Sequence, residues 1–177
     1  MWKAAAQPRP SATQFVLVVI LILIFMGIAA RRIWELRVVA EETEVIRMIG
    51  GMQSALSLQV TERVLKKGLD AVATMNHSNP IDYLKEPPPN YDLLSTPLPP
   101  EQMLPMHWYF DEINGILIYR VGNGEYLDTP LAGPARIRLQ VQLRYDDRNK
   151  NGRYDAGVDS VTGLNLVPLD AYHWRTP

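Results

Sequence analysis

The chain has 177 residues, a net charge of −1 and no cysteine. Without cysteine it has neither disulfides nor thiolate metal sites nor a cysteine nucleophile. Acidic and basic side chains nearly balance, so the composition predicts no nucleic-acid partner. Once about thirty residues are assigned to an apolar N-terminal segment, the remainder is long enough for one small domain.

The first predicted element is a membrane helix. Residues 15–30 include no charged side chain, no polar side chain and no proline, and about 20 such residues span a bilayer as a helix. Ser11 followed by Gln14 is a capping-box pattern, which places the helix start at Ser11. The sequence therefore predicts an N-terminal tail at 1–10 and a transmembrane helix at 11–30. A cleavable signal peptide, with its cleavage site at Ala30, is a second interpretation.

An amphipathic helix is predicted at 31–78. Apolar residues recur there at spacings of three and four and form one stripe: Val45, Ile49, Met52, Leu56, Val60 and Val64. Charged residues such as Glu41 and Glu44 lie mostly off the stripe. Gly50 and Gly51 interrupt it at a cost of about 2 kcal/mol relative to alanine, which predicts a kink or a close contact with another backbone. Asn79-Pro80 ends the helical region.

Residues 79–106 are rich in proline and predict a mostly irregular connection. The segment Pro87-Pro88-Pro89 has two interpretations. It packs on the helix as polyproline, or it recruits a partner that recognises proline-rich segments.

In residues 107–177 apolar residues tend to recur at every second position instead of every third or fourth. This pattern favours strands. Asn114-Gly115 between two apolar runs predicts a hairpin with a type I′ turn. Residues 137–145 alternate apolar and polar side chains, as a half-buried antiparallel strand does. A last strand is predicted near residues 161–169. The fold class is therefore α+β, with a three- or four-stranded antiparallel sheet covered by the amphipathic helix.

The segment after the alternating strand resembles the start of a calcium-binding loop, D-x-[DN]-x-[DN]-G. The candidate oxygen ligands are Asp147, Asn149, Asn151, the carbonyl of Arg153, Asp155 and Asp159. The twelfth position, where an EF-hand has a bidentate acid, is Val158. A plain hairpin turn rich in Asn, Asp and Gly is the other interpretation. Calcium is the only cofactor that the sequence suggests.

No other motif predicts chemistry. His77, His107 and His173 lack metal-ligand spacing, and the chain has no nucleophile elbow, phosphate loop or dinucleotide fingerprint. We therefore expect no enzymatic activity.

A membrane helix that continues into an amphipathic half and precedes a small sheet resembles type IV pilins and the pseudopilins of type II secretion systems. In that family a basic leader ends in glycine, followed by phenylalanine and, at the fifth mature position, glutamate. Phe15 matches this junction, whereas Gln14 replaces the glycine and Val19 the glutamate. Residues 79–84, 86–91 and 108–111 resemble pseudopilin-like proteins of proteobacteria.

The resemblance implies a structural subunit anchored in the bacterial inner membrane, with a periplasmic C-terminal domain. Its partners would be other pilin-like subunits, inner-membrane assembly proteins and the lipid bilayer. The arginines after the apolar segment, Arg31 and Arg32 among them, instead favour a cytoplasmic C-terminal domain by the positive-inside rule; we follow the resemblance. A membrane-anchored periplasmic binding or accessory module that does not polymerise is the alternative function.

Overall fold

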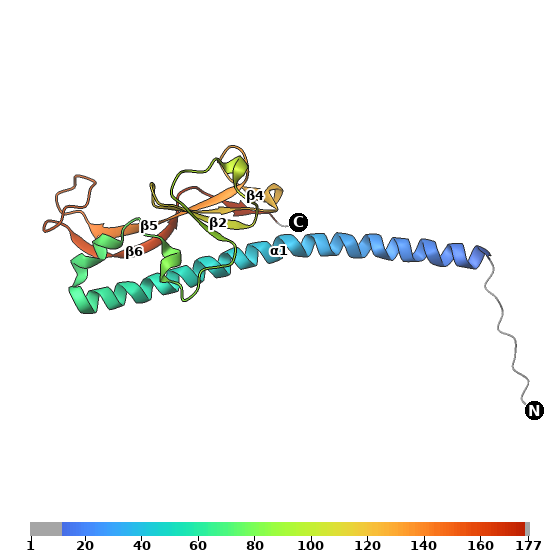
Figure 1. The fold of residues 1–177 in the computed structure, drawn as a ribbon, viewed down its shortest axis with the longest axis horizontal. Coiled ribbons are helices and arrows are strands. Elements are labelled where there is room, and N and C mark those ends of the chain that lie inside the picture. The colour runs from blue at the N-terminus through green and yellow to red at the C-terminus, as the bar shows by residue number, and fades with distance from the viewer. Residues whose placement is uncertain (1–11, 176–177) are drawn as a thin grey trace, which may run out of the picture. The chain divides into compact units, whose positions relative to one another are not determined.

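The structure, a computed structural model, describes residues 12–175 (Figure 1). Within them one long helix precedes a set of short strands, which confirms the α+β class. The helix and strands are α1 (Ala12–Lys67), β1 (Tyr91–Leu94), β2 (His107–Asp111), β3 (Ile116–Arg120), β4 (Leu127–Asp128), β5 (Arg136–Asp146), β6 (Ser160–Pro168) and β7 (His173–Trp174). The 3-10 helices are η1 (Leu69–Met75), η2 (Pro80–Tyr83), η3 (Pro100–Gln102) and η4 (Gly124–Tyr126). The predicted tail at 1–10 and the helix start at Ser11 lie outside the described residues.

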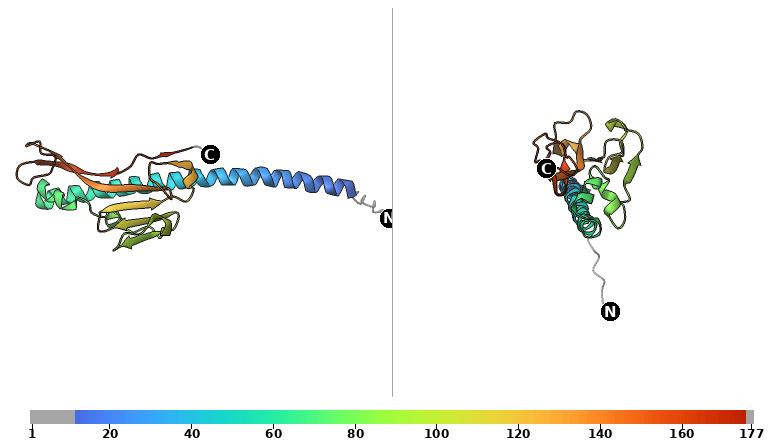
Figure 2. Two further views of the ribbon diagram at one scale, coloured as in Figure 1. Left: turned by 90° about the horizontal axis from the view of Figure 1, so that it is seen from above. Right: turned by 90° about the vertical axis from the view of Figure 1, so that its left-hand side faces the viewer.

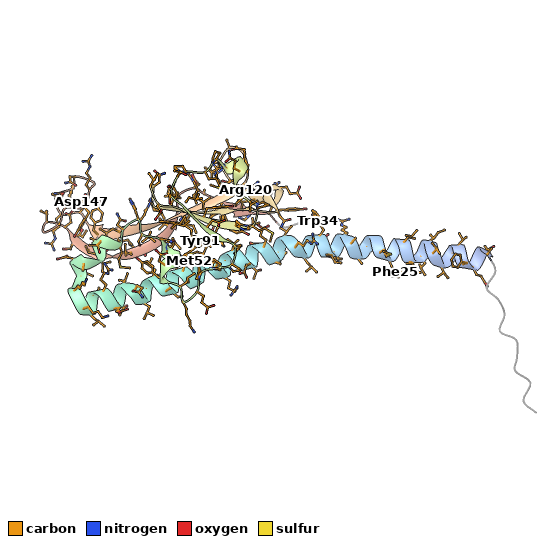
Figure 3. The ribbon with its side chains drawn as sticks, viewed as in Figure 1. Phe25, Trp34, Met52, Tyr91, Arg120 and Asp147 are labelled. Carbon is orange, nitrogen blue, oxygen red and sulfur yellow. The ribbon has the colours of Figure 1, made fainter. Side chains whose placement is uncertain are left out.

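The chain divides after Val39 into two units, which are described separately. In residues 12–39 the apolar side chains between Phe15 and Ile28 are all exposed, as Phe25 illustrates (Figure 3). Within the described chain, α1 is the one helix that is long and apolar enough to cross a membrane. The prediction of a membrane-spanning segment is confirmed to that extent.

The α-helix ends eleven residues earlier than the predicted boundary at residue 78, because α1 stops at Lys67. Gly68 has φ +84°, a left-handed conformation that favours glycine and ends helices. The chain continues as η1, whose Val72 and Met75 are buried. The prediction for 31–78 is therefore right about a helical segment and wrong about one continuous α-helix.

The main sheet has five strands in the order β1-β2-β3-β5-β6, and β4 pairs with β7 in a separate two-stranded sheet. The prediction of a purely antiparallel sheet of three or four strands is wrong, because β1 pairs with β2 in parallel. The other pairs of the main sheet are antiparallel. The strands predicted at 137–145 and 161–169 are confirmed as β5 and β6.

The β2–β3 hairpin is confirmed, but its turn is not type I′. Asp111 pairs with Ile116, so four residues form the connection, and Gly115 has the positive φ, +62°. The Asp111 carboxylate accepts hydrogen bonds from the N–H groups of Ile113 and Asn114, at 3.0 and 3.1 Å. This side-chain cap stabilises a longer loop than Asn114-Gly115 alone predicts.

The core lies between the second half of α1 and one face of the sheet (Figure 2). Val45, Met52 and Leu56 of the predicted stripe are buried there, and Met52 points to the sheet (Figure 3). The alternating residues Ile137, Leu139 and Val141 of β5 meet them in the same cluster. The amphipathic stripe and the strand alternation thus identify the two faces that pack together.

The proline-rich segment 79–106 is more ordered than predicted. It contains η2, β1 and η3. Asn79 accepts the Ile81 N–H at 3.2 Å and donates to the Tyr91 hydroxyl at 2.8 Å. Met103 packs with Tyr109 and Ile118 in a second, smaller cluster. The segment therefore supplies a strand and core side chains to the sheet domain.

Candidate functional site

The predicted calcium loop connects β5 to β6, and Asp147 lies at its start (Figure 3). The Asp147 carboxylate accepts the N–H groups of Gly152 and Asn151 at 2.8 and 3.3 Å. Gly152, at the sixth position, has φ +76°. The sharp turn that the motif needs at its glycine is therefore present.

Three of the candidate ligands converge. Asp155 Oδ2 lies 2.8 Å from Nδ2 of Asn149 and 2.5 Å from Nδ2 of Asn151. If each side-chain amide were rotated by 180°, its oxygen would take the place of its nitrogen. Oxygen is the ligand that calcium prefers. Asn151 Oδ1 also accepts the Arg153 N–H at 2.8 Å, which fixes the position of the seventh residue.

Asp159 has a different role from the one predicted. It is buried, and its two oxygens accept the N–H groups of Arg148 at 3.0 Å and Asp155 at 2.7 Å. These bonds tie the two ends of the loop together. Asp159 therefore braces the loop, and the expected metal ligand is a structural acceptor here.

The candidate ligands of this loop are oxygen atoms, as a hard cation prefers, but few of them are negatively charged. Two carboxylates, Asp147 and Asp155, and two amides are available, whereas Arg148, Lys150 and Arg153 add positive charge to the same loop. Across residues 12–175 no three acidic or histidine side chains group closely enough to hold a metal. Calcium binding at this loop therefore stays a prediction.

A buried carboxylate that the sequence pattern misassigned lies on α1. Glu41, expected off the apolar stripe, is 3% exposed. Its Oε1 accepts the Tyr119 hydroxyl at 3.1 Å and the Gly122 N–H at 2.6 Å. Its Oε2 accepts the backbone N–H of Asn123 at 2.9 Å and the side-chain Nδ2 at 2.6 Å. Glu41 thus connects α1 to the loop after β3.

The Tyr119 hydroxyl is held in its neutral form at this contact. Burial, and then the charge of Glu41, raise the pKa of Tyr119 well above its ordinary value. Tyr119 can therefore only donate to the carboxylate. The signal in the sequence was weak: Glu41 precedes the buried Val45 by four residues, which places both on one helix face.

The exposed side of α1 includes three small residues, Gly50, Gly51 and Ser54, as well as charged residues such as Arg47. A Cβ built on Gly50 or Gly51 meets no atom within 4 Å, and α1 continues through both. The predicted close contact at this pair is therefore absent among the described residues, and no packing within residues 12–175 requires glycine there.

The leader-junction equivalents, Gln14, Phe15 and Val19, lie near the start of α1. Phe15 is 65% and Val19 37% exposed, as an apolar segment for lipid would be. Beyond the segment, Arg31 and Arg32 pair with Glu35 at 3.2 and 3.1 Å. These ion pairs involve the first charged residues of α1.

Comparison with protein-family models, with curated proteins and with solved structures gives no match to this chain.

Proposed function

We propose that the chain is a pseudopilin-like structural subunit of a type II secretion or type IV pilus assembly. The observation that supports this proposal most is that the two halves of α1 have different surroundings. Its apolar residues from Phe15 to Ile28 are exposed, whereas Val45, Met52 and Leu56 pack on a sheet domain. One helix thus provides a lipid-facing segment and the core of the domain that follows.

The exposed face of the second half supports helix association. Glycine in the middle of a helix costs about 1 kcal/mol relative to alanine, and the fold itself does not use the space at Gly50 and Gly51. Small residues allow two helix backbones to approach closely. We infer that related subunits pack along this face.

The proposed location is the bacterial inner membrane, with the sheet domain in the periplasm. The proposed partners are pilin-like subunits and inner-membrane assembly proteins, and the role is structural and not enzymatic. The orientation rests on the family resemblance, since Arg31 and Arg32 favour the opposite one.

A second candidate is a membrane-anchored periplasmic binding or accessory module that does not polymerise. Gln14 and Val19 favour it, because they replace the two residues that the pilin family uses for processing and assembly. In that module the sheet, or the loop of Asp147, Asn149, Asn151 and Asp155, would recognise the partner.

Co-purification from detergent-solubilised membranes tests the first candidate. The full chain with a C-terminal tag is expected to capture pilus or secretion components. A Gly50→Leu, Ser54→Leu variant has larger side chains on the exposed face of the helix. We expect this variant to capture no pilus or secretion components. An unchanged unfolding midpoint would show that the variant keeps its fold. If the native chain captures no such component, the polymer proposal is wrong and the accessory module is favoured.

A further inference from the structure

The two turns of α1 that follow the apolar segment combine basic and apolar side chains. Residues 31–37, which we call the junction segment, contain three arginines and one glutamate, so positive charge is in excess. Ile33 and Leu36 lie among these charged residues and are 57% and 65% exposed. Such a mixture is typical of a helix in the headgroup layer of a membrane, where apolar side chains leave water and arginines reach phosphates.

Arg31 and Arg32 share one acidic partner. Arg31 Nε lies 3.2 Å from Glu35 Oε1, and Arg32 Nη1 lies 3.1 Å from Glu35 Oε2. The side chains of the two arginines are 84% and 78% exposed. Each guanidinium has five N–H donors, and a single carboxylate neutralises one charge. The two arginines therefore keep both a positive charge and the donors that a further anion needs.

Arg37 contacts a ring instead of a carboxylate. Its guanidinium carbon lies 5.8 Å from the centroid of the Trp34 ring, which is a cation–π distance. Arg37 forms no ion pair with a described residue. Trp34 is 52% exposed (Figure 3). Tryptophan is enriched where a membrane helix passes the headgroups, because its ring is apolar and its N–H is polar.

The basic side chains lie around the helix instead of on one face. An α-helix turns by about 100° per residue, so Arg32 and Arg37, five residues apart, are separated by about 140° around the axis. A protein partner contacts one face of a helix, whereas lipids surround it. The distribution of the arginines therefore favours lipid headgroups over a partner protein as the ligand.

We propose that the junction segment binds the phosphate groups of anionic phospholipids, with Trp34 at the depth of the headgroups. Arg32 and Arg37 contact phosphates on two sides of the helix, and Ile33 and Leu36 pack against the lipid. An anionic lipid is favoured over a zwitterionic one because its phosphate charge is not neutralised within the same headgroup. This inference names the class of lipid, holds for either orientation of the chain, and rests on the membrane anchoring in the proposed function.

Glu35 limits this binding. It occupies donors of Arg31 and Arg32, and its charge repels a phosphate nearby. Removal of the Glu35 charge is therefore expected to strengthen the preference for anionic lipid. If the ion pairs only stabilised the helix, no such gain would follow.

Quenching of Trp34 fluorescence by brominated lipids tests the proposal, because bromine on an acyl chain quenches only a nearby tryptophan. The full chain, with Trp2→Phe, is placed in phosphatidylcholine vesicles. These contain either brominated phosphatidylglycerol or brominated phosphatidylcholine at the same mole fraction. A matched chain with Trp34→Phe gives the background from Trp108 and Trp174, which are buried in the sheet domain. The anionic lipid is expected to associate several-fold more strongly, and high salt to weaken this preference.

Three variants separate this contact from a general effect of charge. Arg32→Gln, Arg37→Gln is expected to bring the preference close to one, whereas Glu35→Gln is expected to raise it. The control, Lys66→Gln with Lys67→Gln, removes the same number of positive charges from the last turn of α1. It is expected to leave the preference unchanged.

Equal quenching by the two brominated lipids would overturn the proposal. So would an unchanged preference in Arg32→Gln, Arg37→Gln, no gain in Glu35→Gln, or an equal loss in the lysine control. Retention in membranes after an alkaline wash is measured in parallel. Loss of retention, with no quenching by either lipid, would refute the membrane anchoring itself, whereas retention with equal quenching refutes only the lipid preference.

Discussion

Glu41 of α1 and Tyr119 of β3 form a buried hydrogen bond, 3.1 Å from the phenol oxygen to Oε1, between residues 78 positions apart in the chain. The same carboxylate also accepts the N–H groups of Gly122 and Asn123. Glu41 therefore acts as a shared acceptor for donors on β3 and the loop that follows it. Its removal would leave buried donors without partners, which costs more than the net value of the bonds themselves.

We predict that Glu41→Gln lowers the free energy of unfolding by about 2 to 3 kcal/mol, because an amide has one acceptor oxygen and points an NH₂ group at other donors. Denaturant unfolding followed by tryptophan fluorescence measures this, since Trp108 and Trp174 are both buried in the sheet domain. Glu42→Gln is the matched control and is expected to change the value by less than about 0.5 kcal/mol. Equal midpoints for the two variants would contradict the role of Glu41.

A second prediction concerns Gly50. Gly50→Ala is expected to stabilise the isolated chain by about 1 kcal/mol, because alanine loses less backbone entropy in a helix and the added Cβ meets no atom. The same variant is expected to capture fewer partner subunits from membranes. Gly68→Ala is the contrasting control, since Gly68 has φ +84° and alanine is strained there. If Gly50→Ala destabilised the chain, the glycine would have a role within the fold.

The third prediction concerns pH. Arg138 donates from Nε and Nη2 to the Asp170 carboxylate, both at 2.7 Å, and this pairing lowers the pKa of Asp170. A carboxyl with a lower pKa in the folded than in the unfolded state adds stability above the unfolded value of about 3.9. That contribution is lost as the pH falls through the folded pKa. Arg138→Met should thus be less stable than the native chain at pH 7, by about 1 kcal/mol.

Unfolding midpoints between pH 7 and pH 2 check this prediction. The difference between Arg138→Met and the native chain should shrink as the pH falls from the unfolded value of about 3.9 through the lowered pKa of Asp170. Asp128→Asn removes a more exposed ion pair, with Arg175 at 3.2 Å, and should have little effect at any pH. A difference that is constant with pH would mean that Arg138 stabilises the domain by packing alone.

The regular elements were predictable because their periodicity is local. The alternation of Ile137, Leu139 and Val141 identifies β5, and the spacing of Val45, Met52 and Leu56 identifies the buried helix face. The parallel strand β1 was not predictable, because it has four residues within a proline-rich segment and pairs with β2 through main-chain groups.

The residues of the β5–β6 loop were predicted as a group, and their separate roles were not. Asp159 looks like a displaced ligand by position, but its oxygens bind backbone N–H groups of Arg148 and Asp155. The burial of Glu41 likewise depends on a loop at 121–123 that only the folded chain brings near it. The role of Asp159 depends on the conformation of the loop, and the role of Glu41 depends on contacts with residues about 80 positions away.

The fourth prediction concerns the leader. With Gln14 before Phe15 in place of glycine, the chain is expected to keep its first fourteen residues in the membrane form. Intact-mass analysis of the purified chain measures this. Gln14→Gly restores the residue that the family has before the cleaved bond and serves as the control. A native chain that begins at Phe15 would show that prepilin peptidase accepts glutamine, and would strengthen the polymer proposal.

The fifth prediction concerns orientation. Alkaline phosphatase fused after Pro177 is expected to be active, because that enzyme folds in the periplasm, and a cytoplasmic fluorescent reporter at the same point is expected to be dark. Arg31 and Arg32 favour the opposite result, so the measurement decides between the two arguments. An inactive phosphatase with a fluorescent reporter would place the sheet domain in the cytoplasm.

The last prediction concerns calcium at the β5–β6 loop. Binding to the native state alone, at a concentration one hundred times the dissociation constant, would stabilise the domain by about 2.7 kcal/mol. In a domain of this size the melting temperature would rise by several degrees.

The three basic residues of the loop predict weak affinity, so the full chain in detergent is melted in millimolar calcium and again with a chelator. Asp155→Asn is expected to abolish the difference and leave the melt in chelator nearly unchanged, because the oxygen of the new amide can still accept the side-chain N–H groups of Asn149 and Asn151. Asp159→Asn should lower both melts, since it braces the loop through two backbone N–H groups. Equal melting temperatures of the native chain in calcium and chelator would make the loop a hairpin connection held by its own hydrogen bonds.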